Sequence, residues 1–329
     1  MKKSSLLVIA LLLISGSVFA QADFKLSEQL FSRINQNPSA IGNNDKLQLF
    51  TATRLQWASQ GLSTTPTSAM LNAHYYVDKI KSGFGLSFVY DELGLANQTI
   101  DAKICYAYNI DLREDLLLSL GLSAGVINKR FDPARHVWRD PADPQRPTEV
   151  VSTTNFDLDF GFELSYKYLL VGFSMTHMPN IAKEVSTTVA PAHINAYVRG
   201  NIPLPMNFSL APAFAYMNVG GLNKAAVYNA AGEKESTKIV QDNIIDASIT
   251  AMYKGKYWFG IGYRGGYTGL QSYAFSSDML SFMIGAEWHW LRIGYCYDMS
   301  VGKNLRNYSS NTHEIMLSFI IPTKKPVEW

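Results

Sequence analysis

The chain of 329 residues carries 29 lysines and arginines against 27 aspartates and glutamates, so it lacks the basic footprint of a nucleic-acid-binding protein. It is 47% hydrophobic with a mean hydropathy of −0.03. Beyond its first twenty residues it has no unbroken apolar run of about 18 residues, which excludes membrane-spanning helices. The 18 tyrosines, 17 phenylalanines and 23 glycines fit a membrane β-barrel, whose outer face needs aromatic girdles.

Residues 1–20 are predicted to be a secretory signal peptide. Lys2 and Lys3 form a positively charged start, an apolar core follows, and Val18-Phe19-Ala20 is a small-residue cleavage site. The alternative, an N-terminal membrane anchor, is disfavoured because the apolar run is too short to cross a bilayer as a helix. We therefore expect an exported chain that begins near Gln21. Cleavage removes two of the 29 basic residues and no acid, which leaves 27 side chains of each sign.

The next range, 21–45, shows no period of two. Asn37-Pro38 and Gly42 are residues that end regular elements, so we predict a short helix or irregular segment. Its position before the first strand predicts either a plug inside a barrel or a periplasmic cap, and the sequence leaves both open.

From residue 46 to residue 322, apolar and polar side chains alternate in fourteen runs. The clearest run is 155–168, NFDLDFGFELSYKY, in which seven apolar residues alternate with polar ones that include three acids and a lysine. A period of two is typical of a β-strand, and an apolar face that ends in tyrosines favours contact with lipid. The predicted strands are 46–57, 66–78, 82–91, 97–110, 114–130, 153–167, 169–177, 191–202, 206–218, 243–253, 256–264, 278–288, 290–299 and 312–321.

The links between these runs alternate strictly between tight turns and longer loops. This alternation is expected when one rim of a barrel faces the periplasm and the other faces the exterior. We therefore predict an all-β fold, a transmembrane antiparallel β-barrel of about fourteen strands over 46–322. Both termini of the chain are predicted on the periplasmic side, and a tail follows the barrel at 323–329. A soluble β-sandwich has the same period of two, but it does not require this alternation of link lengths.

No arrangement of residues indicates catalysis, a metal or another cofactor. The six histidines do not pair with each other or with a cysteine at metal-ligand spacing. Ser174 and His177 are three apart on one predicted strand, which places them on opposite faces, and a Ser–His pair from different strands stays open. Cys105 and Cys296 fall on the polar side of their strands, either as two unpaired thiols or as a disulfide across the interior.

Charged side chains recur on the polar face of strand after strand, which points them into the lumen. They are compatible with two arrangements, a diffusion channel lined by charge or a salt-bridged interior that closes the barrel. The candidate lumen charges are Asp101, Lys103, Asp157, Asp159, Glu163, Arg264 and Arg292.

Several short motifs occur in a definite order along nearly all of the predicted mature chain. They are Gln36-Asn37-Pro38-Ser39-Ala40-Ile41-Gly42, Arg54-Leu55-Gln56-Trp57, Gly83-Phe84-Gly85-Leu86, Tyr106-Ala107-Tyr108, Trp258-Phe259-Gly260-Ile261-Gly262-Tyr263-Arg264, Ile293-Gly294-Tyr295-Cys296-Tyr297-Asp298 and His313-Glu314-Ile315. In order and spacing they resemble the PorP/SprF family of type IX secretion system outer-membrane proteins of Bacteroidetes. Ser39 departs from the family pattern, in which alanine is usual at that place.

The resemblance implies a non-enzymatic protein in the outer membrane of a Gram-negative bacterium. It also implies a part in exporting or displaying proteins that carry a C-terminal sorting domain, as in protein secretion and gliding motility. Implied partners are outer-membrane lipid, periplasmic ring or peptidoglycan-linked components, and the secreted cargo. Some relatives serve one surface cargo rather than the core apparatus, and the sequence leaves this choice open. A porin-like solute channel is the alternative function.

Eight motif residues are candidates for a structural or partner-binding role. Turn geometry is the simpler explanation for the asparagine, proline and glycine among them, and anchoring at the membrane interface is the simpler explanation for the tryptophan. The residues are Asn37, Pro38, Gly42, Arg54, Gln56, Trp57, His313 and Glu314.

Overall fold

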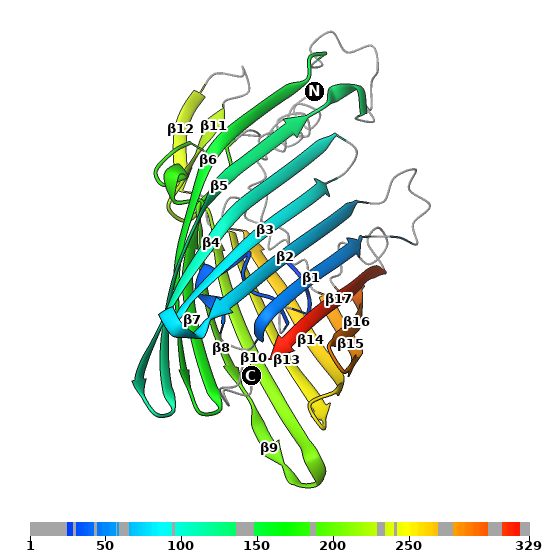
Figure 1. Cartoon of the computed structure of the whole chain (residues 1–329). Coiled ribbons are helices and arrows are strands. Elements are labelled where there is room, and N and C mark those ends of the chain that lie inside the picture. Colours follow the sequence, from blue (N-terminus) through cyan, green and yellow to red (C-terminus); the bar gives the residue numbers. More distant parts are fainter. Residues whose placement is uncertain are drawn as a thin grey trace.

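A computed structural model of the chain shows a closed barrel of 14 antiparallel strands (Figure 1). The structure describes residues 25–28, 31–42, 45–56, 58, 66–93, 96–135, 148–184, 189–228, 234–239, 242–268, 279–301 and 311–322. The predicted signal peptide, Trp57 and the tail at 323–329 therefore lie outside the described residues.

Each barrel strand pairs antiparallel with its neighbour along the chain, and β17 pairs with β1 to close the sheet. The fourteen strands are β1 (Asp45–Leu55), β2 (Thr67–Val77), β3 (Ser82–Leu93), β4 (Asn97–Arg113), β5 (Leu116–Phe131), β6 (Val151–Tyr166), β7 (Leu169–Thr176), β8 (His193–Gly200), β10 (Phe208–Val219), β13 (Asp242–Tyr253), β14 (Tyr257–Thr268), β15 (Met279–Trp288), β16 (Leu291–Ser300) and β17 (Thr312–Pro322). Each coincides with one predicted strand, so the fold prediction is confirmed.

The described residues also form three further strands and five short 3-10 helices outside the fourteen barrel strands. The strand β9 (Ile202–Leu204) pairs with the lower part of β10, while β11 (Lys224–Tyr228) and β12 (Lys234–Ile239) form a separate hairpin that the sequence prediction left as a loop. The 3-10 helices are η1 (Pro38–Ala40), η2 (Asp78–Ile80), η3 (Pro133–Arg135), η4 (Met178–Asn180) and η5 (Pro205–Asn207). No helix among the described residues has the length and apolar character that crossing a membrane requires.

The two rims of the barrel differ in the length of their connections. The tight turns lie at the lower edge in Figure 1, which we call the turn rim, and the opposite ends of the barrel strands form the upper edge, which we call the loop rim. The first and last strands both have their outer ends at the turn rim, where Asp45 is the register partner of Pro322. This is the arrangement that alternating link lengths predicted.

The two faces of the barrel wall differ as the period of two requires. On β6, Phe156 is 60% exposed on the outer face, whereas Asp157 and Glu163 on the inner face are 0% exposed. Successive side chains of a strand point to opposite faces, so one strand supplies both an apolar surface for lipid and charges for the interior.

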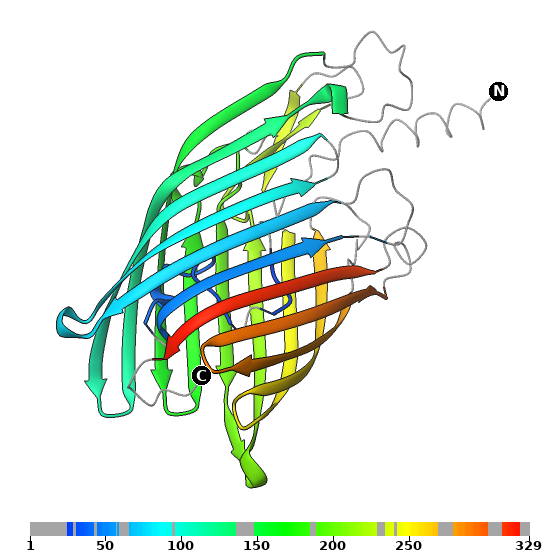
Figure 2. The same cartoon turned by 45° about the vertical axis from the view of Figure 1, so that its right-hand side comes forward.

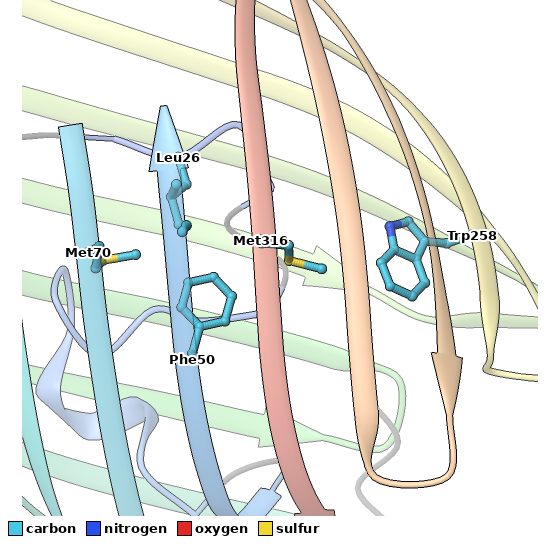
Figure 3. Packing of buried hydrophobic residues seen from close by; sticks show 6 residues of the cluster. Leu26, Phe50, Met70, Trp258 and Met316 are labelled. Atoms are coloured by element: carbon cyan, nitrogen blue, oxygen red, sulfur yellow. The ribbon is translucent and has the colours of Figure 1, made fainter. Parts of the chain in front are cut away.

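Residues 25–28 and 31–42, the inner segment, lie inside the barrel, where the dark blue chain is visible in Figures 1 and 2. Leu26 packs against a cluster of apolar side chains that point inward from the wall, including Phe50, Met70 and Met316 (Figure 3). Burying one such side chain contributes about 1.5–3 kcal/mol. Apolar contact therefore holds one end of the inner segment against β1, β2 and β17.

Candidate functional site

The N-terminal end of the inner segment is bound by carboxylates near the loop rim. The backbone N–H groups of Ser27 and Glu28 both donate to Glu314 at 3.0–3.2 Å, and the Ser27 hydroxyl donates to Asp298 at 2.8 Å. Arg54 completes the cluster, because its guanidinium donates to the Lys25 carbonyl at 2.7 Å and to Asp298 at 3.1 Å. The predicted motif residues Arg54 and Glu314 are thus brought together, and both bind the chain's own segment.

The Glu28 carboxyl is buried in an unusual setting. Its Oε1 accepts a hydrogen bond from the Trp258 indole at 3.1 Å, and its Oε2 has no hydrogen-bond partner among the described residues. Burial, and then the neighbouring Glu314 carboxylate, raise the pKa of Glu28 to about 8. This carboxyl is therefore protonated at neutral pH, which avoids placing a second uncompensated negative charge beside Glu314.

The middle of the inner segment is held by a buried ion pair. Arg33 donates from Nε to Glu163 Oε1 at 2.9 Å and from Nη2 to Oε2 at 3.4 Å. Tyr197 donates its hydroxyl to the same carboxylate and accepts a hydrogen bond from the Asn37 amide at 2.8 Å. Glu163 on β6 therefore serves as an anchor for the inner segment, a role that its position in the strand pattern did not reveal.

The asparagine of the Asn-Pro motif shapes the segment as well as anchoring it. The Asn37 side-chain oxygen caps η1 by accepting from the Ser39 amide at 3.0 Å, and its amide group donates to two backbone carbonyls of the wall. Gly121 and Gly161, which are register partners on β5 and β6, make room for this turn. A Cβ on Gly121 would overlap the Ser39 backbone, and one on Gly161 would overlap the Asn37 side chain.

The inner segment ends in a turn at Gly42. Its φ of +78° lies in the left-handed region, and a Cβ at this position would overlap the Tyr76 ring. The turn at position 42 therefore requires a residue without a Cβ.

The remaining motif residues lie apart from this network. Gln56 follows β1 directly and its backbone N–H donates to the Pro66 carbonyl at 2.9 Å. His313 faces outward, where its Nδ1 is 2.8 Å from the Tyr295 hydroxyl. It therefore lies on the opposite face of β17 from Glu314, so these two neighbours do not form one site.

A second buried network lies on the wall formed by β4, β5 and β6. The Lys103 ammonium is 3.0 Å from Asp101, 2.7 Å from Asp157 and 2.8 Å from Asp159. The His177 Nδ1 is 2.6 Å from Asp157. One ligand atom from each of Asp157, Asp159 and His177 lies within 4.8 Å of the others, which is a spacing that a metal ion can bridge. The Lys103 ammonium supplies positive charge at the same place.

The prediction that Ser174 and His177 lie on opposite faces is wrong. The strand β7 ends at Thr176, and His177 adopts a left-handed φ of 57°, which turns its side chain back into the barrel. Both residues are buried, but Ser174 donates to the Gln36 carbonyl at 2.5 Å rather than to the histidine. Pro179 is the sequence signal that the strand ends before this point.

The other predicted lumen charges are also paired. Arg264 donates to Asp246 at 2.6 Å and to the Leu26 carbonyl at 2.9 Å, and Arg292 donates to Glu287 at 3.0 Å. The described residues thus place the candidate lumen charges in ion pairs. Cys105 and Cys296 are both buried free thiols, so no disulfide crosses the lumen.

Several solved structures share this fold over most of both chains. The monoaromatic hydrocarbon channel TodX, as a deltaS2S3 mutant, is 10% identical with a TM-score of 0.53, and the match covers 92% of this chain and 95% of the channel. A FadL homologue from Pseudomonas aeruginosa is 9% identical with a TM-score of 0.52, covering 88% and 93%. The P. putida toluene transporter TodX is 11% identical with a TM-score of 0.52, covering 87% and 93%. At these identities the likeness shows the fold alone.

No curated protein matches the sequence. A family model described as type IX secretion system membrane protein PorP/SprF matches residues 18–319, which is nearly the whole barrel and the inner segment. The apolar outer wall and the closed strand topology place the chain in the outer membrane, as the resemblance in its motifs implied. The chain belongs to the PorP/SprF family of type IX secretion system membrane proteins.

Proposed function

We propose that this protein is a non-enzymatic structural and interaction component of the type IX secretion system. In this role it supports export or surface attachment of proteins with a C-terminal sorting domain by binding other parts of the machine, cargo, or both. The observation that supports this role most directly is that the inner segment lies in the lumen and is held there by buried polar contacts. The two rims are therefore the surfaces at which we expect partners to bind.

The inner segment itself is a poor docking surface in this arrangement. The sequence left a plug and a periplasmic cap open for the range 21–45, and Lys25, Leu26, Glu28 and Arg33 are all buried against the wall. We therefore assign the periplasmic contacts to the turn rim and treat the inner segment as a plug.

The turn rim offers exposed charges that suit periplasmic partners. The turn between β4 and β5 exposes Arg113, Glu114 and Asp115, and the turn between β13 and β14 exposes Lys254 and Lys256. We propose that ring or peptidoglycan-linked components bind here through complementary charge, which sets specificity more than raw affinity. Cargo then binds at the loop rim, which carries the β11–β12 hairpin.

Deletion and complementation test this role. Cells that lack the protein are expected to lose export of proteins with a C-terminal sorting domain, and the wild-type chain is expected to restore it. A variant that reverses Lys254 and Lys256 to glutamate is expected to insert as a heat-modifiable barrel and to fail in export. A matched variant that replaces Lys254 and Lys256 with arginine keeps both charges and serves as the control, for which normal export is expected. Normal export in the deletion strain would contradict the proposal.

A porin-like solute channel is the second candidate, because a cavity remains in the lumen beside the inner segment. Planar-bilayer recording distinguishes the two. Steady conductance by the purified wild-type protein would support the channel, and conductance that appears only after the inner segment is removed would support the plug.

A further inference from the structure

The inner segment does not fill the barrel evenly. It packs against the walls around β1, β2 and β17 and around β5, β6 and β7, and it leaves a cavity of about 60 Å³ on the side of β8, β10, β13 and β14. The strands on this side have small residues at lumen-facing positions, among them Ala213, Ala215, Ser248 and Gly262. The cavity therefore exists because these strands carry small residues where they face the lumen.

The charges around this cavity are mostly positive. Three guanidinium groups line it, those of Arg33, Arg199 and Arg264, and each of these residues is less than one-tenth exposed. Asp246 is the single carboxylate among the lining residues, and it is already engaged by Arg264 and by Lys25. Glu163 lies outside the lining and pairs with Arg33. With Lys25 included, four basic side chains stand against two carboxylates, so an excess of positive charge remains around the cavity.

We propose that this cavity binds a small oxyanion, a molecule or group with a phosphate or carboxylate head. Guanidinium groups present a planar fork of donors that matches such oxygens, and the hydroxyls of Ser248, Thr250 and Ser281 add neutral donors at the same cavity. Two of the guanidiniums are ion-paired, but the basic groups still outnumber the carboxylates at this buried place, so a bound anion lowers the electrostatic free energy of the folded state. The site is independent of the proposed role in secretion.

The binding test uses the full-length mature protein purified in detergent, with inorganic phosphate as the probe in equilibrium dialysis. Two variants remove different features of the site. Arg199→Gln removes a positive charge, and Gly262→Leu fills the space. A Cβ on Gly262 meets its nearest atoms only at 3.5 Å, so the larger side chain extends into the cavity. Arg130→Gln, on the outer face of β5, is the matched control.

We expect saturable binding of about one phosphate per chain by the wild type and the control. We expect each cavity variant to weaken binding at least about tenfold. Arg199→Gln loses a charge-assisted contact to the anion, and Gly262→Leu fills the space that the anion would occupy. Heat-modifiable migration on gels shows that each variant has folded, and if Arg199→Gln fails this check, Gly262→Leu decides the outcome. The proposal is overturned if the wild type shows no saturable binding, or if a folded Gly262→Leu variant binds as the wild type does.

Discussion

The buried ion pair between Arg33 and Glu163 is expected to hold the inner segment in the lumen. Replacing Arg33 with methionine keeps most of the side-chain volume and removes both hydrogen bonds to a carboxylate that is 0% exposed. Breaking a buried pair by removing one partner costs about 3–5 kcal/mol. Because the barrel wall keeps its backbone hydrogen bonds, we expect this free energy to favour release of the inner segment rather than unfolding of the strands.

A native thiol reports on this release. Cys105 is buried in a cluster with Ile34 and Ile41 of the inner segment, so a maleimide reagent reaches it only when the segment moves away. If opening is fast relative to labelling, the rate follows the open fraction. Since 1.4 kcal/mol corresponds to a factor of ten, a cost of about 3 kcal/mol raises the Arg33→Met labelling rate about a hundredfold.

Two controls make this result decisive. Arg33→Lys keeps the charge but loses the bidentate geometry, and we expect a smaller increase in rate. Arg130→Gln lies on the outer face and is expected to label like the wild type. If folded Arg33→Met protein labels at the wild-type rate, the ion pair does not hold the inner segment and this reasoning is refuted.

Three further changes test other contacts. Lys103→Ala leaves clustered carboxylates without their ammonium, so we expect a lower temperature of heat modification that Zn²⁺ raises again, with no such effect of Zn²⁺ on the wild type. Glu28 has a pKa raised to about 8 in the folded protein, so its contribution to stability is lost as the pH rises from about 4.5 to above 8. Glu28→Gln is expected to flatten that part of the heat-modification profile. Gly121→Ala would collide with the inner-segment backbone and should speed thiol labelling, whereas Gly262→Ala has room and should not. Equal labelling of the two glycine variants would count against the tight fit.

The strands and rims were predictable because every strand of a lipid-facing barrel alternates apolar side chains on the outer face with polar or small residues on the inner face. On β6, the alternation from Phe156 to Tyr166 fixes which side chains face lipid and which face the lumen, and link lengths fix the rims. The β11–β12 hairpin was not predicted. Its two strands lie outside the barrel sheet, so their residues lack the alternation of lipid-facing and lumen-facing side chains that marks a barrel strand.

The partners of the inner segment were beyond sequence reasoning. Nothing in the pattern says that Glu163 meets Arg33 across 130 positions, or that Glu314 receives the backbone of Ser27 across 287. Such contacts depend on how an irregular segment crosses the lumen, which no local periodicity describes. His177 was misplaced for a related reason, because one left-handed residue after a strand reverses the face of the next side chain.

The central claim is that this outer-membrane barrel acts by binding other components of type IX secretion. Affinity purification of the C-terminally tagged protein from solubilised envelopes, followed by identification of the proteins recovered with it, tests this claim most directly. We expect periplasmic ring or peptidoglycan-linked secretion components, or one large surface protein with a C-terminal sorting domain, to be recovered, and the Lys254/Lys256 charge-reversal variant to lose the periplasmic ones. Recovery of no secretion component or such cargo, together with steady ion conductance by the purified wild-type protein, would contradict it.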